Sequence, residues 1–197
     1  RVTTDSSGNI YVTGLTSGGL DGNTSSGSLD IFLVKYNSSG TKQWTKQLGT
    51  SSYVDYGRGV TTDSSGNIYV TGDTLGGLDG NTNSGFEDIF LIKYNSSGTK
   101  QWTKQLGTSK DDRGFGVTTD SSDNIYVSGS TSGELDGNTH FGDRDIFLVK
   151  YNSSGQKQWT KQLGTSYWDS GTRVTTDSSG NIYVTGLTSG GLDGNTS

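Results

Sequence analysis

The chain has 197 residues, a net charge of −5, and a hydrophobic share of only 27%. No run of lysine and arginine is present, which argues against a nucleic-acid partner, because binding to phosphates requires clustered positive charge. The chain has no cysteine, so disulfides, thiolate metal sites and cysteine nucleophiles are excluded. No apolar run approaches the ~20 residues that cross a membrane.

Two hairpins are predicted at the start of the chain. The first joins strands at residues 2–5 and 10–14 through the turn sequence DSSGN, in which glycine supplies a positive φ and the aspartate and asparagine side chains cap the turn. The second joins strands at residues 31–36 and 42–48 through SSG. We name these four strand positions A, B, C and D in chain order.

Strands C and D have different patterns. Strand C, IFLVKY, is apolar at nearly every position, which predicts that both of its faces are covered. On strand D, Trp44 and Leu48 alternate with polar residues, which indicates an outer strand with one packed face and one wet face. We interpret the recurring tryptophan of strand D as packing between repeats.

The four-strand unit recurs along the whole chain. Val2, Val60, Val117 and Val174 each begin the same phrase, VTTDSS, and residues 1–25 are identical to residues 173–197. A long period of this kind indicates a repeat architecture, in which each unit buries its apolar face against its neighbours. The repeat divides the chain into the predicted units 1–58, 59–115, 116–172 and 173–197, the last of which holds strands A and B only.

Four antiparallel strands per repeat of about 57 residues predict an all-β fold of propeller blades. The main alternative is a parallel β-helix, but its coils are normally much shorter and do not contain tight hairpin turns. Three complete blades and one A–B hairpin cannot close an ordinary ring of four to eight blades. The chain is therefore expected to come from a longer array, to complete its fourth blade with neighbouring repeats or other copies, or to stack open.

The phrases DSSGNIYVTG and DIFLVKYNSSGTKQWTKQLG, present throughout the chain, resemble the bacterial SBBP-type β-propeller repeat and, more distantly, the NHL-type blade. The resemblance is specific for the blade and carries over no catalytic residues. It implies a scaffold or binding role in a large bacterial protein that is extracellular or attached to the cell surface. We therefore expect a non-enzymatic protein.

Differences between the repeats are confined to one predicted face. In a four-stranded meander, the B–C and D–A loops emerge at the same end, and these loops vary, whereas the A–B and C–D turns are almost constant. Variation on a constant scaffold is typical of binding surfaces, although neutral drift in tolerant loops gives the same pattern. The aromatic and arginine residues on this face are candidate contacts for glycan or protein: Tyr53, Tyr56, Phe86, Arg113, Phe115, Phe141, Arg144, Tyr167 and Trp168.

The B–C loop contains LDGNT in every copy, followed nine residues after its aspartate by another aspartate in the complete copies. Oxygen ligands around a glycine turn are what calcium prefers, although the EF-hand pattern is not matched. The alternative is an Asx-turn, in which the side chains cap their own backbone. The candidate calcium ligands are Asp21, Asn23, Asp30, Asp79, Asn81, Asp88, Asp136, Asn138 and Asp145.

Catalytic candidates are few. His140 is the only histidine, and no activated nucleophile is indicated beside it. Asp111 and Asp112 are adjacent acids, which we interpret as a solvated pair because glycoside hydrolysis needs two carboxylates at a defined separation in a cleft. Two functions therefore compete: a structural array whose repeats pair with neighbouring copies, and a binding module that uses the variable loop face.

Overall fold

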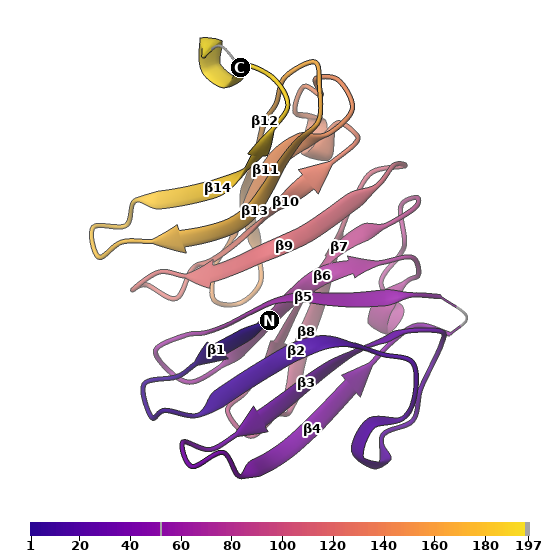
Figure 1. The fold of residues 1–197 in the computed structure, drawn as a ribbon, viewed down its shortest axis with the longest axis vertical. Coiled ribbons are helices and arrows are strands. Elements are labelled where there is room, and N and C mark those ends of the chain that lie inside the picture. The colour runs from indigo at the N-terminus through magenta and orange to yellow at the C-terminus, as the bar shows by residue number, and fades with distance from the viewer. Residues whose placement is uncertain (52, 196–197) are drawn as a thin grey trace.

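The computed structural model describes residues 1–51 and 53–195 and contains four antiparallel sheets, stacked one after another along the chain (Figure 1). Blade 1 consists of β1 (Val2–Thr4), β2 (Ile10–Thr16), β3 (Asp30–Tyr36) and β4 (Lys42–Leu48). Blade 2 consists of β5 (Asp55–Thr62), β6 (Ile68–Thr74), β7 (Asp88–Tyr94) and β8 (Lys100–Leu106). Blade 3 consists of β9 (Asp112–Thr119), β10 (Ile125–Thr131), β11 (Asp145–Tyr151) and β12 (Lys157–Leu163).

The last sheet is a half blade of two strands, β13 (Asp169–Thr176) and β14 (Ile182–Thr188). Each B–C loop contains a short 3₁₀ turn: η1 (Leu20–Gly22), η2 (Leu78–Gly80), η3 (Leu135–Gly137) and η4 (Leu192–Gly194). Within each blade the strands pair in chain order, so the predicted meander and the all-β propeller-type fold are confirmed. The helical segments that the structure describes are three-residue turns, and none has the length or apolar content of a membrane-spanning helix.

The A–B turns are held by the side chain of their first aspartate. In blade 1, Asp5 accepts hydrogen bonds from the backbone N–H groups of Ser7 and Asn9, and its second oxygen accepts from the Tyr11 hydroxyl at 2.9 Å. Gly8 adopts the positive φ, 76°, that the turn requires. The same contacts recur in the later blades, which confirms the predicted turn chemistry.

The apolar core lies between the blades. In β7, Phe90, Ile92 and Tyr94 pack toward blade 1, whereas Ile89 and Leu91 pack toward blade 3. Both faces of this strand are therefore covered, as its apolar sequence predicts. The tryptophans of the outer strands, Trp44 in blade 1 and Trp102 in blade 2, pack against the two core clusters, which confirms their predicted position between blades.

The inner strands β1, β5, β9 and β13 lie next to one another along one side of the array (Figure 1). They line a cavity of about 140 Å³ to which all four sheets contribute. A row of threonine hydroxyls links them: Thr62 donates to the Thr4 carbonyl, Thr119 to the Thr62 carbonyl, and Thr176 to the Thr119 carbonyl, at 3.5, 3.1 and 3.0 Å. The inner strands β5, β9 and β13 are thus each hydrogen-bonded to the inner strand of the preceding blade.

The D–A loops are shorter than the sequence predicts. β5 begins at Asp55, ahead of the predicted unit boundary after residue 58, and a register shift between Gly57 and Gly59 lets the strand continue through both glycines. A side chain on Gly57 would lie only 2.7 Å from the Gly14 carbonyl of blade 1, so close packing between blades requires glycine here. The equivalent strands β9 and β13 likewise begin before the predicted unit boundaries.

Candidate functional site

The B–C and D–A loops meet at one end of each blade, as the sequence predicts. Isolated parallel bridges join Leu29 to Val54 and Arg144 to Trp168, so the B–C loop of one blade is tied to the segment that leads into the next. We call this end the loop face. It contains the residues that differ most between the repeats, and the structure shows which of them are exposed and which are engaged within the molecule.

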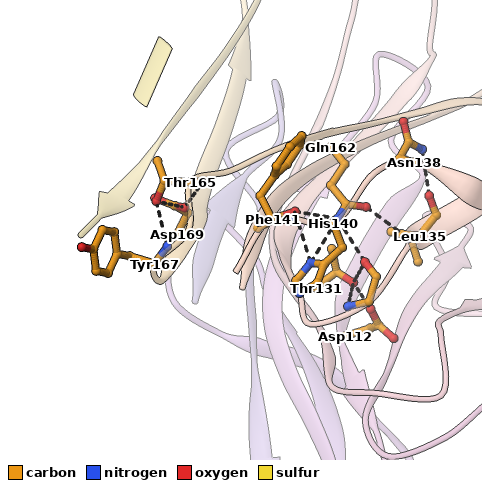
Figure 2. A network of polar contacts seen from close by, with 12 residues as sticks. Asp112, Thr131, Leu135, Asn138, His140, Phe141, Gln162, Thr165, Tyr167 and Asp169 are labelled. Atoms are coloured by element: carbon orange, nitrogen blue, oxygen red, sulfur yellow. Dashed lines mark hydrogen bonds and ion pairs between the residues drawn. The ribbon is translucent and has the colours of Figure 1, made fainter. Parts of the chain in front are cut away.

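Four of the predicted contact residues are open to solvent. Their exposed fractions are 52% for Tyr53, 62% for Phe86, 47% for Phe141 and 59% for Tyr167. They come from different loops, two D–A and two B–C, and two of them, Phe141 and Tyr167, are drawn in Figure 2. The structure therefore places exposed aromatic side chains along the loop face of blades 1 to 3.

Tyr56 and Phe115 lie in the inner strands β5 and β9. Their rings contact Arg58, a residue that was not among the candidates from the sequence. The Arg58 guanidinium lies over both rings, 4.6 Å from the Tyr56 centroid and 5.3 Å from the Phe115 centroid. The same group binds the buried carboxylate of Asp73 in β6, with an Nη2–Oδ2 distance of 3.1 Å. Burial raises the pKa of Asp73 to about 6, against the opposing attraction of Arg58.

A second ionic group joins blades 2 and 3. Arg113 in β9 binds Glu87, which lies just before β7. Asp111 accepts from Arg144 at 3.4 Å and lies 3.8 Å from Arg113. Arg113 and Arg144, both predicted as ligand contacts, are therefore engaged in ion pairs within the chain. Their partners Glu87 and Asp111 also occupy positions that vary between the repeats. This joint variation of acidic and basic residues was the signal in the sequence that could have indicated ion pairs.

Two sets of buried aspartates fix the ends of these loops. Asp30 accepts from the backbone N–H of Ser26 at 2.8 Å and from the Gln47 amide at 2.7 Å. Asp55, at the start of β5, accepts from both the backbone N–H and the hydroxyl of Thr50, at 2.6 and 2.9 Å. Burial raises the pKa of Asp55, and the nearby charge of Asp30 adds to the increase. Asp88 and Asp145 repeat the contacts of Asp30.

The LDGNT segment is a 3₁₀ turn that uses its own polar side chains. Asp21 adopts a φ of 52°, and the Asn23 amide donates to the Leu20 carbonyl at 2.7 Å. The Asp21 carboxylate binds Lys42 and Thr45 on β4, and the hydrogen bond from Lys42 lowers its pKa. Asp79 with Asn81 and Asp136 with Asn138 repeat this arrangement.

The predicted calcium ligands therefore fall into two groups with separate partners. The carboxylates of the LDGNT turns pair with lysine, and the aspartates nine residues later bind loop N–H groups and glutamine. Among residues 1–51 and 53–195, no three histidine, cysteine or acidic side chains are grouped to hold a metal. Calcium binding stays a prediction, and the contacts described here are those of turn and loop anchors.

His140 belongs to the loop network of blade 3 (Figure 2). Its Nδ1 atom lies 3.2 Å from Asp145, which also accepts from Gln162 at 2.8 Å. A polar cavity of about 440 Å³ lies beside it, lined by residues of the preceding D–A loop and of its own B–C loop.

The predicted solvated acid pair is wrong for Asp112. This residue is buried at the start of β9, and its carboxylate accepts hydrogen bonds from the hydroxyls of Thr108 and Thr131.

Comparison with known proteins agrees with the architecture. The family model described as a β-propeller repeat, SBBP, matches residues 1–21, 43–79, 101–136 and 158–193. The chain belongs to the SBBP family of β-propeller repeats. Each match spans strands A and B, and the three later matches begin in the outer strand of the blade before, so the SBBP repeat and the observed blade have the same period but different starting points.

Two curated proteins resemble this SBBP chain over most of its length. An uncharacterized WD repeat-containing protein of Acanthamoeba polyphaga mimivirus is 29% identical over 186 residues, which cover 75% of this chain and 13% of that protein. Regulatory protein FlaEY of Caulobacter vibrioides is 28% identical over 197 residues, covering 87% of this chain and 20% of that protein. The chain therefore spans a small part of the length of these relatives.

Among solved structures, a protein of unknown function from Bacteroides caccae has a similar fold. The TM-score is 0.50 at 12% sequence identity, and the match covers 93% of this chain and 51% of that one. This likeness concerns the fold alone.

Proposed function

We propose that this chain is a non-enzymatic structural scaffold whose blades associate with blades of neighbouring copies to build an array, outside the cell or at its surface. The observation that carries the proposal is an apolar groove at the half blade. The extracellular location rests on the resemblance to the SBBP family. The non-enzymatic assignment is supported by the loop face, where the charged side chains are largely engaged with one another.

The groove has a volume of about 320 Å³ and lies between the outer strands of blade 3 and β14. Its apolar lining includes Leu163, which is 40% exposed, and Leu187, which is 58% exposed. At the two preceding junctions the equivalent space is filled by Phe90 and Phe147, whose side chains are fully buried. Large exposed apolar surfaces of this kind indicate association.

Blade 1 also exposes an apolar residue that is buried at the equivalent position of the next blade. Val2 on the inner strand of blade 1 is 66% exposed, whereas the equivalent Val60 is buried against blade 1. The two ends therefore present complementary halves of the same kind of blade junction. Unlike surfaces that fit one another give head-to-tail association, which closes into a ring or continues as a filament.

Sedimentation velocity over a range of concentrations, with negative-stain electron microscopy, tests this proposal. We expect the parent chain to form rings or filaments. Leu187→Lys should shift the population toward monomer because it places a charge in the groove. The matched control, Phe86→Lys, changes an equally exposed apolar residue on the loop face and should assemble like the parent. A parent chain that stays monomeric, or two variants that behave alike, would contradict the proposal.

The exposed aromatics favour a second candidate function, a binding module for glycan or protein. Tyr53, Phe86, Phe141 and Tyr167 supply ring faces on one end of the molecule, and such side chains anchor interfaces and stack on sugars. Binding to a glycan array, lost in Phe86→Lys and retained in Leu187→Lys, would support this function. The two variants thus separate the binding surface from the assembly surface.

A further inference from the structure

The cavity beside His140 lies where the D–A loop that follows blade 2 meets the B–C loop of blade 3, and we call it the junction pocket. Its volume of about 440 Å³ falls within the range of ~300–1,000 Å³ that is usual for small-molecule sites. The lining residues are Thr108, Ser109 and Lys110 from the D–A loop and Ser132, Gly133, Glu134 and His140 from the B–C loop. Hydroxyl groups and three titratable side chains make this lining suitable for a polar ligand.

The junction pocket is open because a tyrosine found at the other junctions is replaced here. At those junctions the tyrosine ring covers an early glycine of the B–C loop. A side chain built on that glycine would meet the ring at 2.9 Å for the pair Gly76–Tyr53 and at 3.1 Å for the pair Gly190–Tyr167. Lys110 occupies the tyrosine position between blades 2 and 3. Since lysine carries no ring, the space that tyrosine covers elsewhere is left open.

Glu134 occupies a position at which the other copies have glycine. In blade 2, a side chain built on the equivalent Gly77 would lie only 2.2 Å from the Asn81 carbonyl oxygen, and blade 1 has the same restriction. Blade 3 therefore holds the glutamate only by a shift in the turn that follows it. Because crowding of this kind destabilises a fold, neutral drift does not favour a side chain here, and a functional reason for the glutamate is indicated.

Lys110 and Glu134 bring opposite charges to the junction pocket from its two loops. Both residues are exposed, and within residues 1–51 and 53–195 neither takes part in an ion pair. The neighbouring Asp111, by contrast, is engaged with Arg113 and Arg144. A ligand that spans the pocket can therefore meet a cation on one loop and a carboxylate on the other.

His140 is oriented by a buried acid. Its Nδ1 atom lies 3.2 Å from the carboxylate of Asp145, which is fully buried and also accepts from the Gln162 amide. A ring nitrogen that faces a carboxylate carries the proton, so the Nε2 atom of the neutral ring is a hydrogen-bond acceptor. The pocket lining thus contains a second acceptor for ligand hydroxyls in addition to the carboxylate of Glu134.

Two exposed aromatic residues are adjacent to the pocket lining. Phe141 directly follows His140, and Phe86 follows Gly85, where a side chain would come within 2.6 Å of the Ser109 Cα atom. The exposed fractions of the two phenylalanines, 47% and 62%, leave their rings available to a ligand. Aromatic faces together with acceptors for hydroxyl groups favour a sugar, and the lysine adds a preference for a negatively charged one.

We propose that the junction pocket binds a uronic acid unit of an acidic glycan. The sugar carboxylate pairs with the Lys110 ammonium, and the ring hydroxyls donate to the Glu134 carboxylate and to Nε2 of His140. Phe86 and Phe141 contact the neighbouring sugar units. This inference rests on the second candidate function, the glycan-binding loop face, and names its pocket and its class of ligand.

Isothermal titration calorimetry with tetragalacturonate and with its C4 epimer, tetraglucuronate, tests the pocket. We expect the parent to bind at least one of the two acids, with one site per chain. The methyl ester of the acid that binds keeps the hydroxyls and lacks the negative charge. It should bind at least about tenfold more weakly, because a charge-assisted hydrogen bond is lost.

The test variants copy residues that the other repeats already contain, so each should keep the fold, which circular dichroism verifies. Lys110→Tyr reproduces the other junctions and should lower the affinity at least about tenfold. Glu134→Gly and His140→Asn reproduce blade 2, and each should weaken binding about threefold or more. The matched control, Tyr53→Lys, places a lysine between blades 1 and 2, where the glutamate and histidine positions hold glycine and asparagine. It should bind like the parent, again with one site per chain.

The outcomes distinguish this inference from the functions proposed above. Equal affinity for the acid and its methyl ester, or unchanged binding in Lys110→Tyr and Glu134→Gly, overturns the junction pocket and leaves a glycan site elsewhere on the loop face. A parent chain that binds neither acid overturns it as well. Lys110→Tyr should sediment like the parent, because it leaves the apolar groove unchanged, so the scaffold proposal is tested separately.

Discussion

Asp73 is a buried acid whose charge state should control stability between about pH 4 and about pH 6. Its pKa in the folded protein is raised to about 6, and in the unfolded chain it should be near the ordinary ~3.9. In this window the native state binds more protons than the unfolded state, so the free energy of unfolding falls as pH rises. At roughly 1.4 kcal/mol per pKa unit, the two-unit difference corresponds to about 3 kcal/mol.

Asp73→Asn removes this titration and leaves all others in place. We expect the free energy of unfolding of the variant, relative to that of the parent, to increase by about 3 kcal/mol as the pH is raised from about 4 to about 7. The measurement is urea unfolding at each pH, followed by tryptophan fluorescence. A folding control is the double variant Arg58→Phe with Asp73→Ser, which copies the pair found at these positions in blade 3. A difference that stays flat with pH would show that the attraction of Arg58 fully offsets burial, and a difference that shrinks as pH rises would show that it outweighs burial.

Three further predictions concern the blades and their junctions. Phe90→Ala should cost about 3–5 kcal/mol of unfolding free energy in chemical denaturation, because its ring is fully buried, whereas Phe32→Ala in monomeric protein should cost roughly half as much. Glu87→Arg should destabilise the chain by about 2 kcal/mol, and adding Arg113→Glu should recover most of that loss in a double-mutant cycle; failure to recover would mean the pair is not coupled. Asp63→Ala should lower the thermal midpoint measurably, since the carboxylate caps a turn with four hydrogen bonds, and an unchanged midpoint would contradict that role.

The blade could be predicted from the sequence because its determinants are local and repeated. The turn aspartate, the positive-φ glycine and the alternation of Trp44 and Leu48 each specify a neighbouring piece of backbone, and three copies of each pattern agree. Strand C could be interpreted in the same way, because continuous apolar sequence requires cover on both faces.

The candidate site could be predicted only in outline. The loop face follows from topology, but the pairs Arg58–Asp73 and Glu87–Arg113 join residues from different strands or blades, and single-sequence periodicity does not bring such residues together. The D–A loops are shorter than the sequence predicts because the positions that vary between repeats continue into the first residues of β5, β9 and β13. The glycine at position 57 reflects the close approach of a neighbouring blade, a constraint visible only in three dimensions.

The threonine row of the inner strands gives the array a direction. Each hydroxyl, at Thr62, Thr119 and Thr176, donates toward the blade that comes earlier in the chain, and none of these three donates toward a later one. A blade leaving the ribosome therefore meets the acceptor carbonyl of this row on a blade that has already been synthesised. Assembly during synthesis can proceed blade by blade from the N-terminus. A near-identical later repeat is then less able to mispair with an early blade, because it has not yet been synthesised.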